Sequence, residues 1–142
     1  MAARTDTIPA VLLVDDDSDH LMLTRLLLQR GGHRVLETTS TRDAFELLAT
    51  NRVSIIIADE NMPGMSGVEF LRRVKLMYPD TMRIMFSGAG DFSTATAAIN
   101  EGEVHKFFVK GRDEELLRRE IGKKFRQERA GLPQKLMKPD VN

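Results

Sequence analysis

The chain has 142 residues with 21 Lys and Arg against 21 Asp and Glu, so its net charge favours neither nucleic acid nor an anionic membrane as a partner. It contains no Cys, which excludes disulfides, a thiolate zinc site and a cysteine nucleophile. Residues 1–9 lack the apolar run of a signal peptide, and no apolar segment approaches the roughly 20 residues that span a bilayer. We therefore expect a single soluble domain in the cytoplasm.

Five short apolar runs along the chain have the composition of β-strands. The central run contains three consecutive isoleucines, Ile55–Ile57, and such a run suggests a strand that is buried on both faces of a parallel sheet. The five predicted strands are Ala10–Val14, His33–Glu37, Val53–Ala58, Met82–Phe86 and Val104–Val109. Each is followed by a stretch long enough to form a helix.

These intervening stretches are amphipathic and carry helix boundary signals. Ser40, Ser66 and Asp91 are predicted to cap three of the helices, Gly31 ends the first helix, and the acidic run 113–115 suits the positive end of the last. In the first helix one face carries Leu21, Arg25 and Leu28, and Leu23, Leu26 and Leu27 widen its apolar side. The side chains predicted to face the core in the other helices are Ala44, Leu47 and Leu48 in the second, Phe92, Ala95, Thr96 and Ile99 in the fourth, and Leu117, Ile121 and Phe125 in the fifth.

A strand followed by a helix, repeated five times, predicts an α/β fold with a five-stranded, doubly wound parallel sheet. In such sheets the ligand site lies beyond the carboxyl ends of the strands. We assign residues 9–127 to this domain and residues 128–142, where the periodicity is lost, to a C-terminal tail or linker. His20, His33 and His105 lack metal-ligand spacing and are expected at the surface or edges of the fold.

Polar residues stand directly after four of the predicted strands: Asp15 and Asp16, then Asp59, then Ser87, then Lys110. Two carboxylates about 4 Å apart repel by roughly 4 kcal/mol at an effective dielectric constant near 20. A cluster of oxygen ligands suits Mg²⁺, which relieves this repulsion and also binds phosphate oxygens. Phosphoryl transfer depends mainly on positioning and charge neutralisation. The pattern therefore predicts Mg²⁺-dependent phosphoryl transfer to a carboxylate, without indicating which carboxylate reacts.

Four segments resemble the response-regulator receiver domains of two-component systems, the CheY-like family. The segments are Val11–Asp16, Ser54–Gly67, Phe86–Gly88 and Phe107–Lys110, and they occur in the family's order on the matching elements. The resemblance spans about residues 9–125 and implies the flavodoxin-like (βα)5 receiver fold. Residues 100–108 also resemble receivers that precede HD-type phosphohydrolase domains.

The resemblance implies that Asp59 is the phosphoacceptor, which would receive its phosphoryl group from a sensor histidine kinase or a phosphotransfer protein. It also implies a Mg²⁺ site formed by Asp15, Asp16, Asp59 and the main-chain carbonyl of Asn61. Such a domain is a phosphoprotein switch in a phosphorelay. It catalyses only its own phosphorylation and dephosphorylation, so we do not expect an enzyme in the usual sense.

The same resemblance assigns roles to residues around the phosphoryl group. Ser87 and Lys110 would hold this group, and Phe107 would turn inward when Ser87 moves toward it. This motion would reshape the face made by the fourth helix, the fifth strand and the fifth helix, which the family uses for homodimer formation or contact with an output domain or partner protein. Gly111 stands where the family usually has proline, often with a cis bond, so we expect a looser loop after Lys110.

Two alternative functions stay open. A haloacid-dehalogenase-type phosphatase would use Asp15 as the nucleophile and Asp17 as the general acid. That family also needs acidic residues after a further strand, whereas only a helix is predicted after Lys110, and Asp59 would have no role. The second alternative is a receiver fold that serves as an unphosphorylated docking module, with which Gly111 and the lack of a recognisable output domain are compatible.

Overall fold

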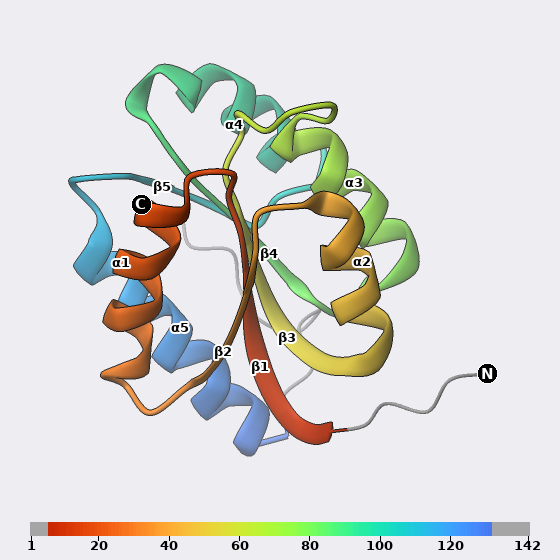
Figure 1. The fold of residues 1–142 in the computed structure, drawn as a ribbon, viewed down its shortest axis with the longest axis vertical. Coiled ribbons are helices and arrows are strands. Elements are labelled where there is room, and N and C mark those ends of the chain that lie inside the picture. The colour runs from red at the N-terminus through yellow and green to blue at the C-terminus, as the bar shows by residue number, and fades with distance from the viewer. Residues whose placement is uncertain (1–5, 132–142) are drawn as a thin grey trace.

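The computed structural model describes residues 6–131, which form a five-stranded parallel sheet with helices on both faces (Figure 1). The strands are β1 (Asp6–Val14), β2 (Arg34–Thr38), β3 (Asn51–Ala58), β4 (Met82–Ser87) and β5 (Lys106–Val109), in the spatial order β2-β1-β3-β4-β5. The helices are α1 (Ser18–Gln29), α2 (Thr41–Thr50), α3 (Gly67–Met77), α4 (Phe92–Asn100) and α5 (Glu114–Arg129), and a short 3₁₀ turn, η1 (Ala89–Asp91), precedes α4. This order is the flavodoxin-like one, so the predicted fold class is confirmed. None of these helices is both long enough and apolar enough to cross a membrane.

Two apolar clusters hold the sheet between its helical layers. Helices α1 and α5 cover one face, and α2, α3 and α4 cover the other (Figure 1). Successive side chains of a strand point to opposite faces, and Ile55 accordingly packs under α1 and α5 whereas Ile56 packs under α2 and α3. The run of isoleucines is therefore buried on both sides, as its composition predicts.

The boundaries of the elements differ from the predicted ones mainly at the ends of the chain. β1 begins at Asp6 rather than Ala10, and β5 begins at Lys106 rather than Val104. α5 continues to Arg129, so the first residues of the predicted tail are helical. Residues 132–142 of that tail lie outside the described residues.

The inward faces of α1 and α4 were predicted only in part. In α1 the buried residues are Leu21, Thr24 and Leu28, one helical turn apart, whereas Leu23 and Leu26 are 61% and 51% exposed. Those two leucines fall off the stripe that meets the sheet, because a helix turns about 100° per residue. In α4 the small residues Ala95 and Ala98 face the core, and Phe92, Thr96 and Ile99 are exposed, contrary to the prediction.

The side chain of Arg83 ties the start of β4 to two loops at the amino end of the sheet. Its buried guanidinium donates hydrogen bonds to the main-chain carbonyls of Pro79, Thr81, Gly102 and Glu103, at 2.8–3.3 Å. Nδ1 of His105, next to the edge strand β5, accepts the Arg83 backbone N–H at 2.9 Å. Burial, reinforced by the charge of Arg83, lowers the pKa of His105 to about 4. This histidine is therefore a neutral acceptor in the scaffold.

Candidate functional site

The register of the sheet brings the four predicted polar groups to one edge. Val14 pairs with Ala58, so Asp15 and Asp59 follow neighbouring strands, and the Asp59 N–H donates to the Val14 carbonyl at 3.1 Å. Ser87 ends β4 opposite Val109, so Lys110 emerges directly beside it. Parallel strands end at the same edge of a sheet, and the side chains consequently converge.

Three carboxylates form an acidic cluster at this edge. One oxygen from each of Asp15, Asp16 and Asp59 lies within 4.8 Å of the others. Asp15 and Asp59 are only 5% and 8% exposed, whereas Asp16 faces solvent. Buried carboxylates this close together repel one another, and a cluster made of oxygen donors with an open side fits a hard cation that keeps some of its waters, such as Mg²⁺.

Lys110 is the cation that balances part of this charge. Its Nζ donates to Oδ2 of Asp15 at 2.7 Å and to Oδ2 of Asp59 at 3.1 Å. Burial by itself would lower the pKa of Lys110, but the two carboxylates outweigh it and raise the pKa above its ordinary value. Burial likewise opposes ionisation of Asp15, and hydrogen bonds from His20 and Lys110 nevertheless lower the pKa of this carboxyl. Lys110 is therefore charged, and it bridges the two buried acids.

Ser87 connects the acidic cluster to a fourth carboxylate, on Asp91. Oγ of Ser87 is buried, contacts Oδ1 of Asp59 and lies 2.7 Å from Oδ2 of Asp91. The same Asp91 oxygen accepts a hydrogen bond from Nδ2 of Asn61 at 3.1 Å. Asp91 occupies the N-cap position of α4 but makes no side-chain cap bond, so the cap predicted for it is wrong. The sequence did not indicate Asp91 as a site residue.

The loop between β3 and α3 fixes the main chain of Asp59. The Gly67 N–H donates to the Glu60 carbonyl at 2.9 Å, and the Glu60 side chain accepts from the Val68 N–H at 2.9 Å. Ser66 caps α3 as predicted, by accepting from the Glu69 N–H at 3.2 Å. Gly67 lies so close to β3 that a Cβ atom there would fall 2.2 Å from the Asp59 carbonyl oxygen.

The side chains around Asp15 include one neighbour that the sequence did not indicate. Nδ1 of His20 lies 3.1 Å from Oδ2 of Asp15, and the His20 ring packs against Phe86 with 5.2 Å between centroids. Asp17 stands apart from the acidic cluster: its carboxylate caps α1 by accepting from the N–H groups of Asp19 and His20. The one signal for this contact is the position of His20 on the first turn of α1, next to the end of β1, and it does not by itself single out His20 as a site residue.

Phe107 lies on β5, three residues before Lys110, and Gly111 directly follows Lys110. The half-buried Phe107 ring contacts the exposed Phe92 edge-on, with 6.1 Å between centroids. Gly111 has φ +83° and donates its N–H to Oε2 of Glu114 at 2.6 Å. Proline can adopt neither this φ value nor this hydrogen bond. The loop expected to be looser is therefore closed by a bond that the glycine makes possible, and the described residues contain no cis peptide bond.

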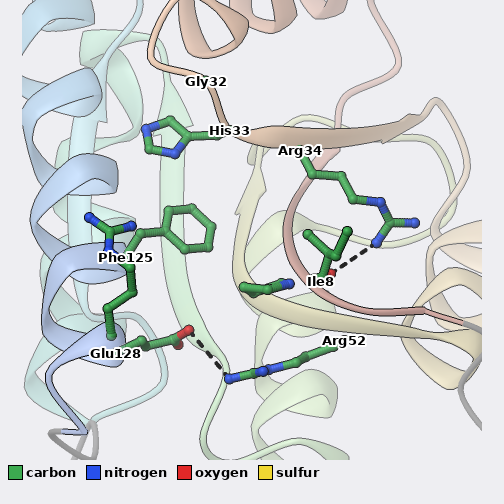
Figure 2. Close-up of a pocket in the computed structure, with 9 residues that line it drawn as sticks. Ile8, Gly32, His33, Arg34, Arg52, Phe125 and Glu128 are labelled. Atoms are coloured by element: carbon green, nitrogen blue, oxygen red, sulfur yellow. Dashed lines mark hydrogen bonds and ion pairs between the residues drawn. The ribbon is translucent and has the colours of Figure 1, made fainter.

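A separate pocket of about 460 Å³ lies at the opposite end of the sheet, between the amino ends of β2 and β3 and the last turns of α5 (Figure 2). Arg34 there donates to the Ile8 carbonyl at 3.2 Å and to Oδ1 of Asn51 at 2.8 Å, and Arg52 lies 4.0 Å from Glu128. His33 stacks on Phe125. None of the predicted site residues lines this pocket, so it is separate from the acidic cluster.

Comparison with known proteins points to the same family as the site does. The family described as the response regulator receiver domain matches residues 11–122. The hydrogenase transcriptional regulatory protein HoxA of Cupriavidus necator is 36% identical over 106 residues, which cover 75% of this chain and 22% of that protein. The virulence sensor protein BvgS of Bordetella pertussis is 36% identical over 98 residues, 66% of this chain and 8% of that protein.

Solved structures give the same picture. The signal receiver domain of an HD domain-containing protein from Pseudomonas fluorescens Pf-5 has a TM-score of 0.77 and 29% identity, and the match covers 86% of this chain and 98% of that one. An uncharacterized protein from Neptuniibacter caesariensis has a TM-score of 0.79 and 32% identity, with 87% and 93% covered. The chain spans about a fifth of the length of the first curated relatives, which are transcriptional regulatory proteins such as HoxA.

Proposed function

Because the chain belongs to the response regulator receiver domain family, we propose that Asp59 accepts a phosphoryl group from a histidine kinase or phosphotransfer protein in the cytoplasm. The observation that carries this proposal is the convergence of Asp59 with Asp15, Ser87 and Lys110 at one edge of the sheet. The chain spans only part of the length of its relatives. We also propose that it passes its signal on through an output domain, a partner protein or a homodimer.

The reaction we propose follows from the contacts of Asp59. One carboxylate oxygen attacks the phosphorus atom, the bond from phosphorus to the donor breaks, and an acyl phosphate forms. Lys110 and Ser87, which now contact the Asp59 carboxylate, would each donate to a phosphoryl oxygen. Mg²⁺, held by Asp15, Asp16, Asp59 and the main-chain carbonyl of Asn61, would neutralise charge on the phosphoryl oxygens. The chain would thus catalyse only its own phosphorylation and dephosphorylation.

The switch we propose involves Ser87 and Phe107. When Ser87 moves toward the phosphoryl group, the Phe107 ring would turn inward and lose its contact with Phe92. Phe92 is 63% exposed on α4, so this rotation would alter the surface made by α4, β5 and α5. That surface is where we place contact with a partner or a second copy of the chain.

Neither alternative function is favoured by the site. A dehalogenase-type phosphatase would need Asp17 as a general acid, but the Asp17 carboxylate caps α1. Within residues 6–131 only α5 follows Lys110, so no further strand supplies the extra acids that this enzyme requires. A docking module that is never phosphorylated would not need the contacts that Lys110 and Ser87 make with Asp59.

The function is tested by incubating the purified chain with acetyl phosphate and Mg²⁺ and measuring its intact mass. We expect uptake of one phosphoryl group, located on Asp59 by peptide mapping, and no uptake in the presence of EDTA because the acidic cluster then lacks its cation. A label on Asp15 would support the phosphatase alternative instead. No uptake at any Mg²⁺ concentration would support the docking module.

Removal of the Lys110 cation should change two measurements in opposite directions. We expect Lys110→Met to slow phosphorylation by about 10²-fold, because a charge that stabilises the transition state is lost. We also expect it to bind Mg²⁺ several-fold more tightly, since the ammonium no longer competes for Asp15 and Asp59. Stopped-flow kinetics and a Mg²⁺ titration test this, with the exposed Lys123→Met as the matched control. Weaker Mg²⁺ binding in Lys110→Met would contradict the argument.

A further inference from the structure

Two carboxylates compete for the hydroxyl of Ser87. Its Oγ contacts Oδ1 of Asp59 and lies 2.7 Å from Oδ2 of Asp91. A serine hydroxyl has a single hydrogen to donate, so it cannot donate to both carboxylates at once. The phosphoryl oxygens of a modified Asp59 would be a third and stronger claimant, because they carry more charge.

Asp91 is also the side chain that joins the start of α4 to the site. Besides Ser87, it accepts a hydrogen bond from Asn61 at 3.1 Å, in the loop that follows β3. The helix itself is weakly held, because it has nine residues and buries only the small side chains of Ala95 and Ala98. It has no side-chain cap, although aspartate at this position is well suited to cap a helix.

Phosphorylation would change the charge around Asp91. The acyl phosphate carries roughly −1.5 to −2 charges, in place of the single negative charge of the Asp59 carboxylate. A more negative Asp59 would therefore repel Asp91 while it draws the Ser87 hydroxyl away.

We propose that Asp91 restrains the unphosphorylated state by holding Ser87 and Asn61, and that phosphorylation of Asp59 releases it. Once released, the Asp91 carboxylate is free to cap α4. Asp91 then exchanges its hydrogen bonds with Ser87 and Asn61 for bonds from the first backbone N–H groups of the helix. The inference rests on the proposed function, since the phosphoryl group is what displaces Asp91. Asp91 is thus a positioning residue that acts through Ser87 and couples the phosphoacceptor to α4.

The test uses beryllofluoride, a phosphoryl mimic, with saturating Mg²⁺ on the full chain. Wild type is titrated first, and binding there that depends on Asp59 establishes the proposed function independently. We then expect Asp91→Ala to bind beryllofluoride about five-fold or more tightly, because the restraint no longer has to be broken. Asp91→Asn should fall between Asp91→Ala and wild type, and the exposed Asp80→Asn should match wild type.

A double-mutant cycle separates action through Ser87 from a general effect of charge. In a Ser87→Ala background the Asp91→Ala change should have little effect on beryllofluoride affinity, because the bond it breaks is already gone. Hydrogen exchange of the first backbone amides of α4 should fall on beryllofluoride binding in wild type, because the released Asp91 carboxylate then caps them, and should stay high with and without beryllofluoride in Asp91→Ala. An unchanged affinity in Asp91→Ala, or the same gain with and without Ser87, would overturn the proposal while leaving the phosphoacceptor role intact.

Discussion

Asp59→Asn is expected to abolish phosphoryl uptake from acetyl phosphate, with a loss of about 10³-fold or more, the scale seen when an essential nucleophile is removed. The amide has nearly the shape of the carboxylate, and its single oxygen can still accept from Ser87 or from Lys110, which contact different oxygens of Asp59. Its oxygen is, however, a poor nucleophile. One negative charge also leaves the acidic cluster, so we expect weaker Mg²⁺ binding without loss of the fold.

Intact-mass measurement after incubation with acetyl phosphate and Mg²⁺ checks this result, and urea unfolding checks that the fold is kept. Asp15→Asn is the informative comparison, because it removes a neighbouring carboxylate but leaves the proposed nucleophile in place. It should slow uptake by weakening Mg²⁺ binding, and the effect should diminish as Mg²⁺ is raised. Full labelling of Asp59→Asn would refute the assignment of the phosphoacceptor.

The convergence of the site could be predicted because it depends on sheet topology alone. Residues that directly follow parallel strands meet at the same edge, and this brings together Asp15, Asp59, Ser87 and Lys110 whatever the details of packing. The alternation of strands and helices fixes the fold class by the same kind of argument. The metal role of the Asn61 carbonyl and the turning of Phe107 stay predictions.

The partners of individual side chains could not be predicted in the same way. Asp91 has the residue type and position of a helix cap, and only the arrangement of three loops in space makes Ser87 and Asn61 its partners instead. His20 reaches Asp15 for a similar reason, since the direction in which α1 leaves β1 decides which of its side chains point at the site. Local sequence does not contain this information.

The exposed leucines of α1 show a second limit. Leu23 and Leu26 are as apolar as the buried Leu28, so composition alone makes the whole helix look buried. The rotation of the helix about its axis is set by Leu21, Thr24 and Leu28, and a buried threonine is hard to anticipate. Its hydroxyl is satisfied inside the helix, by the carbonyl of His20 at 3.0 Å, which removes the cost of burying it.

Gly67 is the position where one methyl group should damage both the fold and the site. An added Cβ would lie 2.2 Å from the carbonyl oxygen of Asp59 and 2.8 Å from Cα of Glu60. Both contacts are with the main chain, so no flexible side chain can move aside to relieve them. The start of α3 and the end of β3 would have to move apart. This movement would break the hydrogen bond from the Gly67 N–H to the Glu60 carbonyl.

We therefore expect Gly67→Ala to lower the free energy of unfolding by about 3 kcal/mol or more, the upper range for overpacking, because the clash involves backbone on both sides. Displacement of Asp59 relative to Ser87 and Lys110 should also slow phosphorylation by about 10²-fold in the molecules that remain folded. Urea unfolding and acetyl phosphate kinetics measure the two effects. Gly90→Ala is the matched control at the same edge of the sheet, since a Cβ there meets nothing within 4 Å. A Gly67→Ala chain as stable as Gly90→Ala would show that α3 is free to move, and that its packing does not hold Asp59 in place.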